Sequence, residues 1–144
     1  MNELNDLIKN IIGGSFDYNE KNEIIFNKKS KEFVLNNVAT GLKAFGALQL
    51  LISNNVLKTD TLLIIDEPEV HLHPTWQVKF AEILVLLSKK FAIPMVLTSH
   101  SPYFIEAIEA YSIKHNFQKS IDFYFAQKQA EGTNSKIINI KDPI

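Results

Sequence analysis

Two neighbouring carboxylates, Asp66 and Glu67, directly follow a run of aliphatic residues in the stretch LLIIDEPEVHLHP, which covers residues 62–74. A lone histidine, His100, follows a second apolar run, in the stretch PMVLTSHSP. Carboxylates set against a dry apolar wall interact strongly with the group that they hold, and they are costly to bury without a charge partner. The residue types and their placement therefore predict a polar site in which an acid pair and an imidazole act on one ligand.

The elements around these residues predict how the chain brings them together. Residues 61–65 and 94–98 are largely aliphatic runs of the kind that form strands buried on both faces. Pro74 and Pro102 each suit the first turn of a helix, and apolar residues recur at helical spacing after each of them. Alternating strands and helices predict an α/β fold with a mostly parallel sheet and right-handed crossovers. Ligands of such sheets lie beyond the carboxyl ends of the strands, where the acid pair and the histidine would meet.

The rest of the chain predicts peripheral elements around this sheet. Gly13 and Gly14 end a short amphipathic helix, and Thr40 is placed to cap the start of another. Pairs of short strands around polar turns indicate two β-hairpins. The expected ranges are a helix over residues 2–12, strands over 15–18 and 24–26, a helix over 41–51, and strands over 121–126 and 136–140 around a turn at 132–135.

Composition restricts the class of protein. The chain has 144 residues, of which 46% are hydrophobic, and this is enough for one ordinary core. Its formal net charge of -1 gives no overall basic field that would attract nucleic acid or an anionic membrane. All 15 basic residues are lysines, so the segment has no arginine finger, and the absence of cysteine excludes disulfides and thiolate metal sites. Without a spanning segment or a signal-like N-terminus, we expect a cytoplasmic protein with no membrane partner.

Three motifs of the chain together resemble ATP-binding-cassette ATPases. LLIIDEP is similar to the Walker B strand of these proteins, and VLTSHSP is similar to their switch-histidine strand. NVATGLKAFGAL, which precedes both, resembles a degenerate signature motif with Thr40-Gly41 in place of the usual Ser-Gly. DEPE-x-x-LHP followed by TSHSP most resembles the AAA_21/AAA_15 group, whose relatives include overcoming-lysogenization-defect nucleases and RecF-like and SMC-like proteins. The resemblance covers about residues 36–110 and implies a partial P-loop NTPase lobe.

The resemblance implies a role for each residue of the polar site. Asp66 would hold Mg²⁺ through a water, so that the ion bridges the phosphates of ATP. Glu67 would orient or deprotonate the attacking water, and His100 would contact the γ-phosphate. ATP and Mg²⁺ are therefore the cofactors that the resemblance implies.

The same resemblance assigns four further residues to nucleotide contacts. Thr40, Gly41 and the first amides of their helix would bind an anion, which is the task of a signature motif toward the nucleotide of the opposite subunit. Glu69 and His73 lie in the stretch that corresponds to the D-loop, which touches the opposite subunit in this family. The resemblance thus implies a homodimer that clamps two ATP molecules.

One essential part of such an ATPase, the P-loop, has no counterpart in the sequence. Gly41 and Gly46 have the G-x-x-x-x-G spacing, but Ala47-Leu48 stands where Lys-Ser/Thr is required, so we interpret the spacing as a coincidence of helix packing. Residues 1–144 are therefore expected to be a single domain, the C-terminal half of a nucleotide-binding domain, which is inactive without an N-terminal P-loop lobe. The resemblance implies work on DNA, in repair or anti-phage defence, with DNA or an effector nuclease as further partners.

Two other functions stay open at this point. His71 and His73, with Asp66 nearby, could form the metal site of a metal-dependent hydrolase, since neutral imidazoles and carboxylates bind Zn²⁺ or Mn²⁺. His73 could instead cap the helix that begins at Pro74, or lie in an interface. The third interpretation is a noncatalytic interaction module that keeps the fold, although the intact acid pair argues against it.

Overall fold

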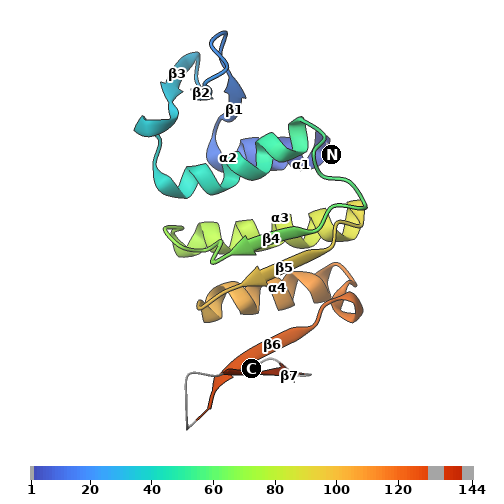
Figure 1. The fold of residues 1–144 in the computed structure, drawn as a ribbon. Helices are drawn as coiled ribbons and strands as arrows, with labels where there is room; N and C mark the ends of the chain where they lie inside the picture. Colours follow the sequence, from blue (N-terminus) through green and yellow to red (C-terminus); the bar gives the residue numbers. More distant parts are fainter. Residues whose placement is uncertain (1, 130–134, 141–144) are drawn as a thin grey trace.

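Two parallel strands, each followed by a helix, form the centre of the molecule. The structure is a computed structural model that describes residues 2–129 and 135–140. Strand β4 (Leu63–Asp66) pairs in parallel with β5 (Met95–Thr98), and α3 (Pro74–Phe91) forms the crossover between them. Helix α4 (Pro102–Lys114) follows β5. The predicted order of strand, helix, strand and helix is confirmed, and Figure 1 shows β4 and β5 running side by side in the middle of the chain.

Only one face of this strand pair is covered. Leu63 and Ile65 pack against the hydrophobic core, whereas Ile64 is 67% exposed and Val96 is 49% exposed. The prediction that residues 61–65 are buried on both faces is therefore wrong for this chain. Parallel strands need a covering layer on each face, and the described residues supply only one.

Four helices contribute buried side chains to the main hydrophobic core. Helices α1 (Asn2–Ile12) and α2 (Thr40–Ser53) lie on the α3 side of the strand pair. The ring of Phe45 in α2 meets that of Phe80 in α3 edge to face, with 4.9 Å between the centroids, a geometry that adds about 0.5–1.5 kcal/mol to the burial of the rings. Both predicted helices are confirmed. Among the helices of residues 2–129, none is long and apolar enough to cross a membrane.

The start of α2 differs from its prediction. Thr40 is the first residue of the helix, and the capping position belongs to Ala39, which makes no side-chain hydrogen bond. The prediction that Thr40 caps the helix is therefore wrong. The helix begins one residue earlier than expected because the N–H of Leu42 donates to the carbonyl oxygen of Ala39 at 3.0 Å, which puts Ala39 at the capping position. In the first turn, Gly41 packs so closely that a Cβ there would lie 2.9 Å from the carbonyl oxygen of His71.

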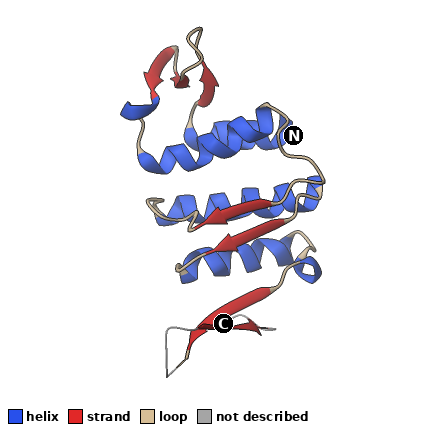
Figure 2. Cartoon of the chain, viewed as in Figure 1, coloured by secondary structure: helices blue, strands red, loops and turns tan. Residues whose placement is uncertain are grey.

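A three-stranded antiparallel sheet lies at one end of the molecule (Figure 2). It consists of β1 (Ser15–Tyr18), β2 (Ile24–Lys28) and β3 (Lys31–Val34). The predicted hairpin of β1 and β2 is confirmed, but β3 was not predicted. Lys29 and Ser30 form the tight turn before β3 with φ of 46° and 61°, values that hairpin turns usually reach with Asn or Gly.

The last two strands form a separate antiparallel ladder. Strand β6 (Phe123–Lys128) pairs with β7 (Ser135–Ile140), as predicted, and the ladder lies beyond α4 in Figure 1. Of the turn predicted at 132–135, residues 132–134 lie outside the described residues. Single-turn helices precede α2 and β6, namely η1 (Leu35–Asn37) and η2 (Gln118–Ser120).

Candidate functional site

The carboxyl ends of β4 and β5 share one edge of the molecule with the first turns of three helices. Both strand arrows in Figure 2 end on the side where α2, α3 and α4 begin. Parallel pairing is the cause, because the register sets Asp66 opposite Thr98 and the loops after both strands emerge at the same level. Every residue predicted for the polar site lies at this edge.

A threonine hydroxyl joins the two acidic residues. Thr98 Oγ1 donates a hydrogen bond to a carboxylate oxygen of Asp66 and accepts one from the backbone N–H of Glu67 at 3.1 Å. The same N–H lies 3.1 Å from the Thr98 carbonyl oxygen, a bond that ends the parallel ladder. The hydroxyl thus aligns Asp66, which stays exposed and open to a cation. Sequence reasoning missed Thr98, whose signal was its place opposite Asp66 at the end of the neighbouring strand.

Glu67 and His100 meet directly. The distance from His100 Nε2 to Glu67 Oε1 is 3.3 Å, and the two side chains are 89% and 41% exposed. Even as an ion pair, a contact between side chains this exposed would contribute only about 0–1 kcal/mol to stability, so both groups remain available to a ligand. Glu67 also has φ of 44°, a left-handed conformation that is strained for a residue other than glycine and is frequent at functional sites. The expected meeting of the acid pair with the imidazole is therefore found.

Glu69 is buried beside this pair. It is 5% exposed, and its Oε1 accepts hydrogen bonds from the Ser99 hydroxyl at 2.6 Å and from the backbone N–H groups of His100 and Ser101 at 3.0 Å and 3.3 Å. Its Oε2 is also buried, and no group in the described part of the chain donates to it. The carboxylate therefore joins the loop after β4 to the loop after β5.

A second polar contact joins the same two loops. The Ser101 hydroxyl caps α4 by accepting from the N–H of Phe104 at 3.3 Å, and it donates to Gln77 Oε1 at 2.8 Å. Gln77 Nε2 in turn donates to the carbonyl oxygen of Leu72 at 3.2 Å. Sequence reasoning missed Gln77, because a glutamine on a helix carries no motif signal of its own.

The two histidines of the β4–α3 loop have local backbone roles. His73 caps α3, since its Nδ1 accepts from the backbone N–H of Thr75 at 3.3 Å, and His71 adopts a left-handed conformation with φ of 67°. The capping role considered for His73 is confirmed. Within residues 2–129 and 135–140, no group of three or more His, Asp and Glu side chains could hold a metal ion. In that part of the chain, His71 and His73 therefore do not form a metal site with Asp66.

The glycines of α2 serve helix packing. A Cβ on Gly41 would lie 3.3 Å from the side chain of Leu72, in addition to its close approach to the β4–α3 loop. Gly46 lies in the same uninterrupted helix, and a Cβ there would lie 2.6 Å from the ring of Phe16. The G-x-x-x-x-G spacing is therefore a consequence of packing, as predicted, since a continuous helix cannot wrap a phosphate as a P-loop does.

The edge suits Mg²⁺ but not a complete ATP site. Mg²⁺ takes oxygen ligands and is commonly bound by one or two carboxylates together with waters and substrate phosphates. Asp66 and Glu67 offer such carboxylates at an exposed edge, one of them aligned by Thr98. Within the described residues, however, no glycine-rich loop is available to surround the β- and γ-phosphates.

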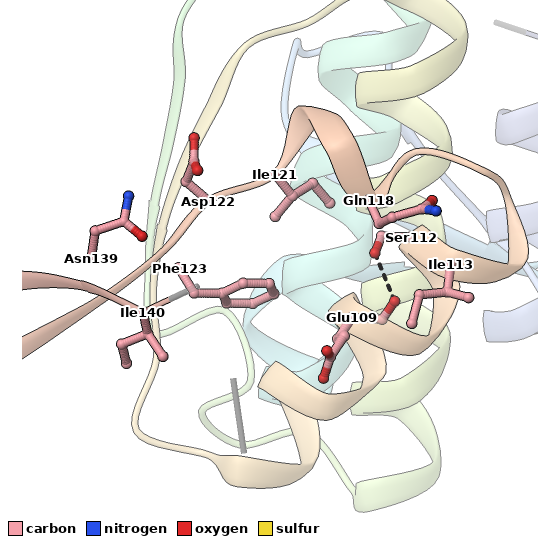
Figure 3. A pocket seen from close by; sticks show the side chains of 9 residues that line it. All are labelled: Glu109, Ser112, Ile113, Gln118, Ile121, Asp122, Phe123, Asn139 and Ile140. Atoms are coloured by element: carbon pink, nitrogen blue, oxygen red, sulfur yellow. Dashed lines mark hydrogen bonds between the residues drawn. The ribbon is translucent and has the colours of Figure 1, made fainter. Parts of the chain in front are cut away.

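A separate hollow lies between α4 and the β6–β7 ladder (Figure 3). It has a volume of about 330 Å³ and an apolar part formed by Ile121, Phe123 and Ile140. Next to it, the Ser112 hydroxyl donates to the carbonyl oxygen of Glu109 at 2.7 Å. None of the residues that line the hollow belongs to the polar site, so the two features are distinct.

A comparison with protein families agrees with the arrangement of the motifs. The family AAA_21, described as "AAA domain, putative AbiEii toxin, Type IV TA system", matches residues 2–106. The match covers well over half of the chain and includes both central strands, α3 and the start of α4.

Solved structures of SMC ATPases share the fold. One, from the study "Structural biochemistry of ATP-driven dimerization and DNA stimulated activation of SMC ATPases", covers 97% of this chain and 82% of its own, with a TM-score of 0.67 and 14% identity. The SMC head domain from Thermotoga maritima aligns with 98% of this chain over 47% of its own length, with a TM-score of 0.61 and 19% identity. The Smc head domain from Pyrococcus furiosus, bound to the C-terminal domain of ScpA, aligns with 96% of this chain over 34% of its own length, with a TM-score of 0.65 and 15% identity.

The chain thus spans 47% and 34% of the two SMC head structures from Thermotoga maritima and Pyrococcus furiosus, although almost all of it aligns with each. At identities below 20%, the TM-scores of 0.67 and 0.61 show a common fold and no more, whereas the family match rests on the sequence itself. This chain belongs to the AAA_21 family and has the fold of the head domains of SMC ATPases.

Proposed function

We propose that this chain is the C-terminal half of an ATP-binding-cassette ATPase domain, and that it supplies the hydrolytic residues for ATP held by a P-loop on another lobe. The observation that carries the proposal is the 3.3 Å approach of His100 Nε2 to Glu67 Oε1 at the carboxyl ends of two parallel strands. In open α/β sheets this edge is where ligands bind.

Each residue at the edge has a definite task in this proposal. Glu67 orients and deprotonates the water whose oxygen attacks the γ-phosphorus, while the bond from that phosphorus to the leaving ADP oxygen breaks. His100 donates a hydrogen bond to a γ-phosphate oxygen, and its contact with Glu67 directs both groups to the same phosphoryl group. Asp66, aligned by Thr98, would hold Mg²⁺ through a water, and bound Mg²⁺ supplies neutralisation of the phosphate charge.

The uncovered face of the strand pair supports the idea of a half domain. Leu62, Ile64 and Val96 are 55%, 67% and 49% exposed, although parallel strands are normally covered on both faces. A second lobe that packs there would bury these side chains and bring its P-loop to the same sheet edge. We propose this lobe as the first partner, either on the same polypeptide or as a separate subunit.

We extend the proposal to a homodimer that encloses two ATP molecules. Thr40 is exposed at the start of α2, and Ala39 offers no side-chain cap, so the first amides of this helix are suited to a phosphate held by a second copy. For Glu69 and His73 the contacts support a different use, because both side chains bond within their own chain.

The wider role follows from the relatives. The study of SMC ATPases concerns ATP-driven dimerization and DNA-stimulated activation, and the matched family is named for a toxin–antitoxin system. We propose that ATP-driven closure is coupled to work on DNA, in repair or anti-phage defence, with DNA or an effector nuclease as partner. A chain without cysteine suits the reducing cytoplasm.

ATP turnover with and without the second lobe tests the proposal. The 144-residue chain alone is expected to show no magnesium-dependent release of phosphate from ATP, because residues 2–129 and 135–140 contain no loop that could hold the β- and γ-phosphates. Turnover should arise when the P-loop lobe is joined to it or added. A chain that hydrolyses ATP equally well without any P-loop would refute the half-domain proposal.

A further inference from the structure

Within the proposed ATPase, we infer that Glu69 is a positioning residue, whose buried carboxylate holds the loop after β5 so that His100 faces Glu67 and the γ-phosphate. The catalytic part of this inference rests on the proposed function, whereas the structural part does not. The resemblance implied that Glu69 contacts the nucleotide. The inference instead assigns Glu69 to the loop after β5 of its own chain.

The loop needs such an anchor because the sheet stops short of it. The β4–β5 ladder ends where the N–H of Glu67 reaches the carbonyl oxygen of Thr98. Beyond that point the N–H groups of His100 and Ser101 have no strand partner, and buried or half-buried amides require an acceptor. Glu69 Oε1 accepts both of them, together with the Ser99 hydroxyl, across a separation of 30 to 32 residues in sequence. The Ser101 N–H also donates to Ser99 Oγ at 3.1 Å, so within the described part of the chain the His100 N–H is the amide that depends on Glu69 alone.

The side chain of His100 depends on this backbone anchor. Its imidazole is 89% exposed, so packing does little to fix its position, and its polar contact on the described part of the chain is with Glu67. A movement of the loop backbone would therefore move the imidazole away from Glu67. A carboxylate is a suitable anchor, because hydrogen bonds to a charged acceptor are about twice as strong as bonds between neutral groups.

The use of a single oxygen distinguishes this role from direct contact with Mg²⁺ or nucleotide. Oε1 takes all three donors, and the buried Oε2 has none from residues 2–129 or 135–140. A glutamine can retain the Oε1 acceptor, so Glu69→Gln should keep much of the anchor, whereas Glu69→Ala removes it. If Glu69 instead served as an anionic ligand, the glutamine would be as deficient as the alanine.

Amide hydrogen exchange of the 144-residue chain, followed by NMR, tests the structural part. The N–H of His100 should exchange about 10- to 100-fold faster in Glu69→Ala, the change expected for loss of a bond to a charged acceptor, and by a smaller factor in Glu69→Gln, whose neutral oxygen is a weaker acceptor. The N–H of Ser101 should change less, because Ser99 Oγ also accepts it. Ser99→Ala removes one of the three donors to Glu69 and also an acceptor of the Ser101 N–H, so the exchange rate of the His100 N–H is the readout for this variant. That rate should show an intermediate increase, and the variant covers the case in which Glu69→Ala does not fold. Glu106→Ala, at an exposed position of α4, is the matched control and should leave both rates unchanged. Unchanged rates in Ser99→Ala and in a folded Glu69→Ala would overturn the inference.

Steady-state kinetics with the P-loop lobe present tests the catalytic part. Glu69→Ala should lower kcat and leave the KM for ATP unchanged, because ATP is held by the other lobe, and Glu69→Gln should restore most of kcat. A raised KM with unchanged kcat, or a glutamine variant no better than alanine, would overturn the positioning role. Absence of turnover in the wild-type protein would instead refute the proposed ATPase, and the exchange rates would still decide whether Glu69 anchors the loop.

Discussion

Replacement of Glu67 by glutamine is expected to slow ATP hydrolysis about 100- to 10,000-fold, the range that a positioned general base contributes. Glutamine has nearly the same size and can still accept a hydrogen bond, but it cannot take the proton of the attacking water. ATP binding should stay near the wild-type value, because in the proposed arrangement the phosphates are held by a P-loop on another lobe. The measurement is single-turnover hydrolysis at saturating ATP, together with the Kd of a fluorescent ATP analogue.

A matched control is available on α4. Glu106→Gln makes the same chemical change at an exposed position away from the strand ends, and it should leave both turnover and binding unaltered. Wild-type turnover in Glu67→Gln would show that another group acts as the base. Equal loss of binding and turnover would show that Glu67 holds the nucleotide instead of the water.

Replacement of Gly46 by valine is expected to lower the free energy of unfolding by about 1–3 kcal/mol, the usual effect of overpacking a core. A Cβ there would lie 2.6 Å from two ring atoms of Phe16. That ring cannot easily move aside, because it packs on Phe26 with 4.8 Å between the centroids and the N–H of Phe16 donates to Gln49 Oε1 at 2.8 Å. Urea unfolding followed by circular dichroism measures the change.

The adjacent residue provides the control for this substitution. Ala47 is exposed in the same helix, so Ala47→Val loses helix propensity, about 0.5 kcal/mol, without meeting the core. Gly46→Val gains a few tenths of a kcal/mol of helix propensity, about 0.3–0.5, so propensity cannot explain a loss of stability at position 46. A loss larger than that of Ala47→Val is therefore due to the contact with Phe16. Equal destabilisation would contradict the view that Gly46 exists for close packing of α2 on β1.

Much of the site could be predicted because it depends on local patterns and one general rule. The helices follow from apolar spacing, and β4 and β5 follow from their aliphatic runs. Parallel strands present their carboxyl ends at the same edge, so Asp66, Glu67 and His100 were expected to meet, and the 3.3 Å contact of the last two agrees with this.

The rest depends on tertiary contacts that leave no local pattern. Ile64 is 67% exposed in this chain. An isoleucine in a strand would look the same in the sequence whether solvent or a second lobe lay against it, so its exposure could not be predicted. Glu69 resembles a nucleotide contact in its motif, but its three donors come from a loop 30 to 32 residues away. Strand β3 escaped prediction because Lys29 and Ser30 turn the chain without Asn or Gly.

The central claim is that Glu67 and His100 act on the same phosphoryl group. The most direct test is a structure of this chain with its P-loop lobe, trapped with Mg²⁺, ADP and vanadate, which mimics the phosphoryl group in transfer. We expect the vanadate to lie within hydrogen-bond distance of His100 Nε2, with its attacking-side oxygen next to the Glu67 carboxylate. A vanadate bound out of reach of either side chain would contradict the account.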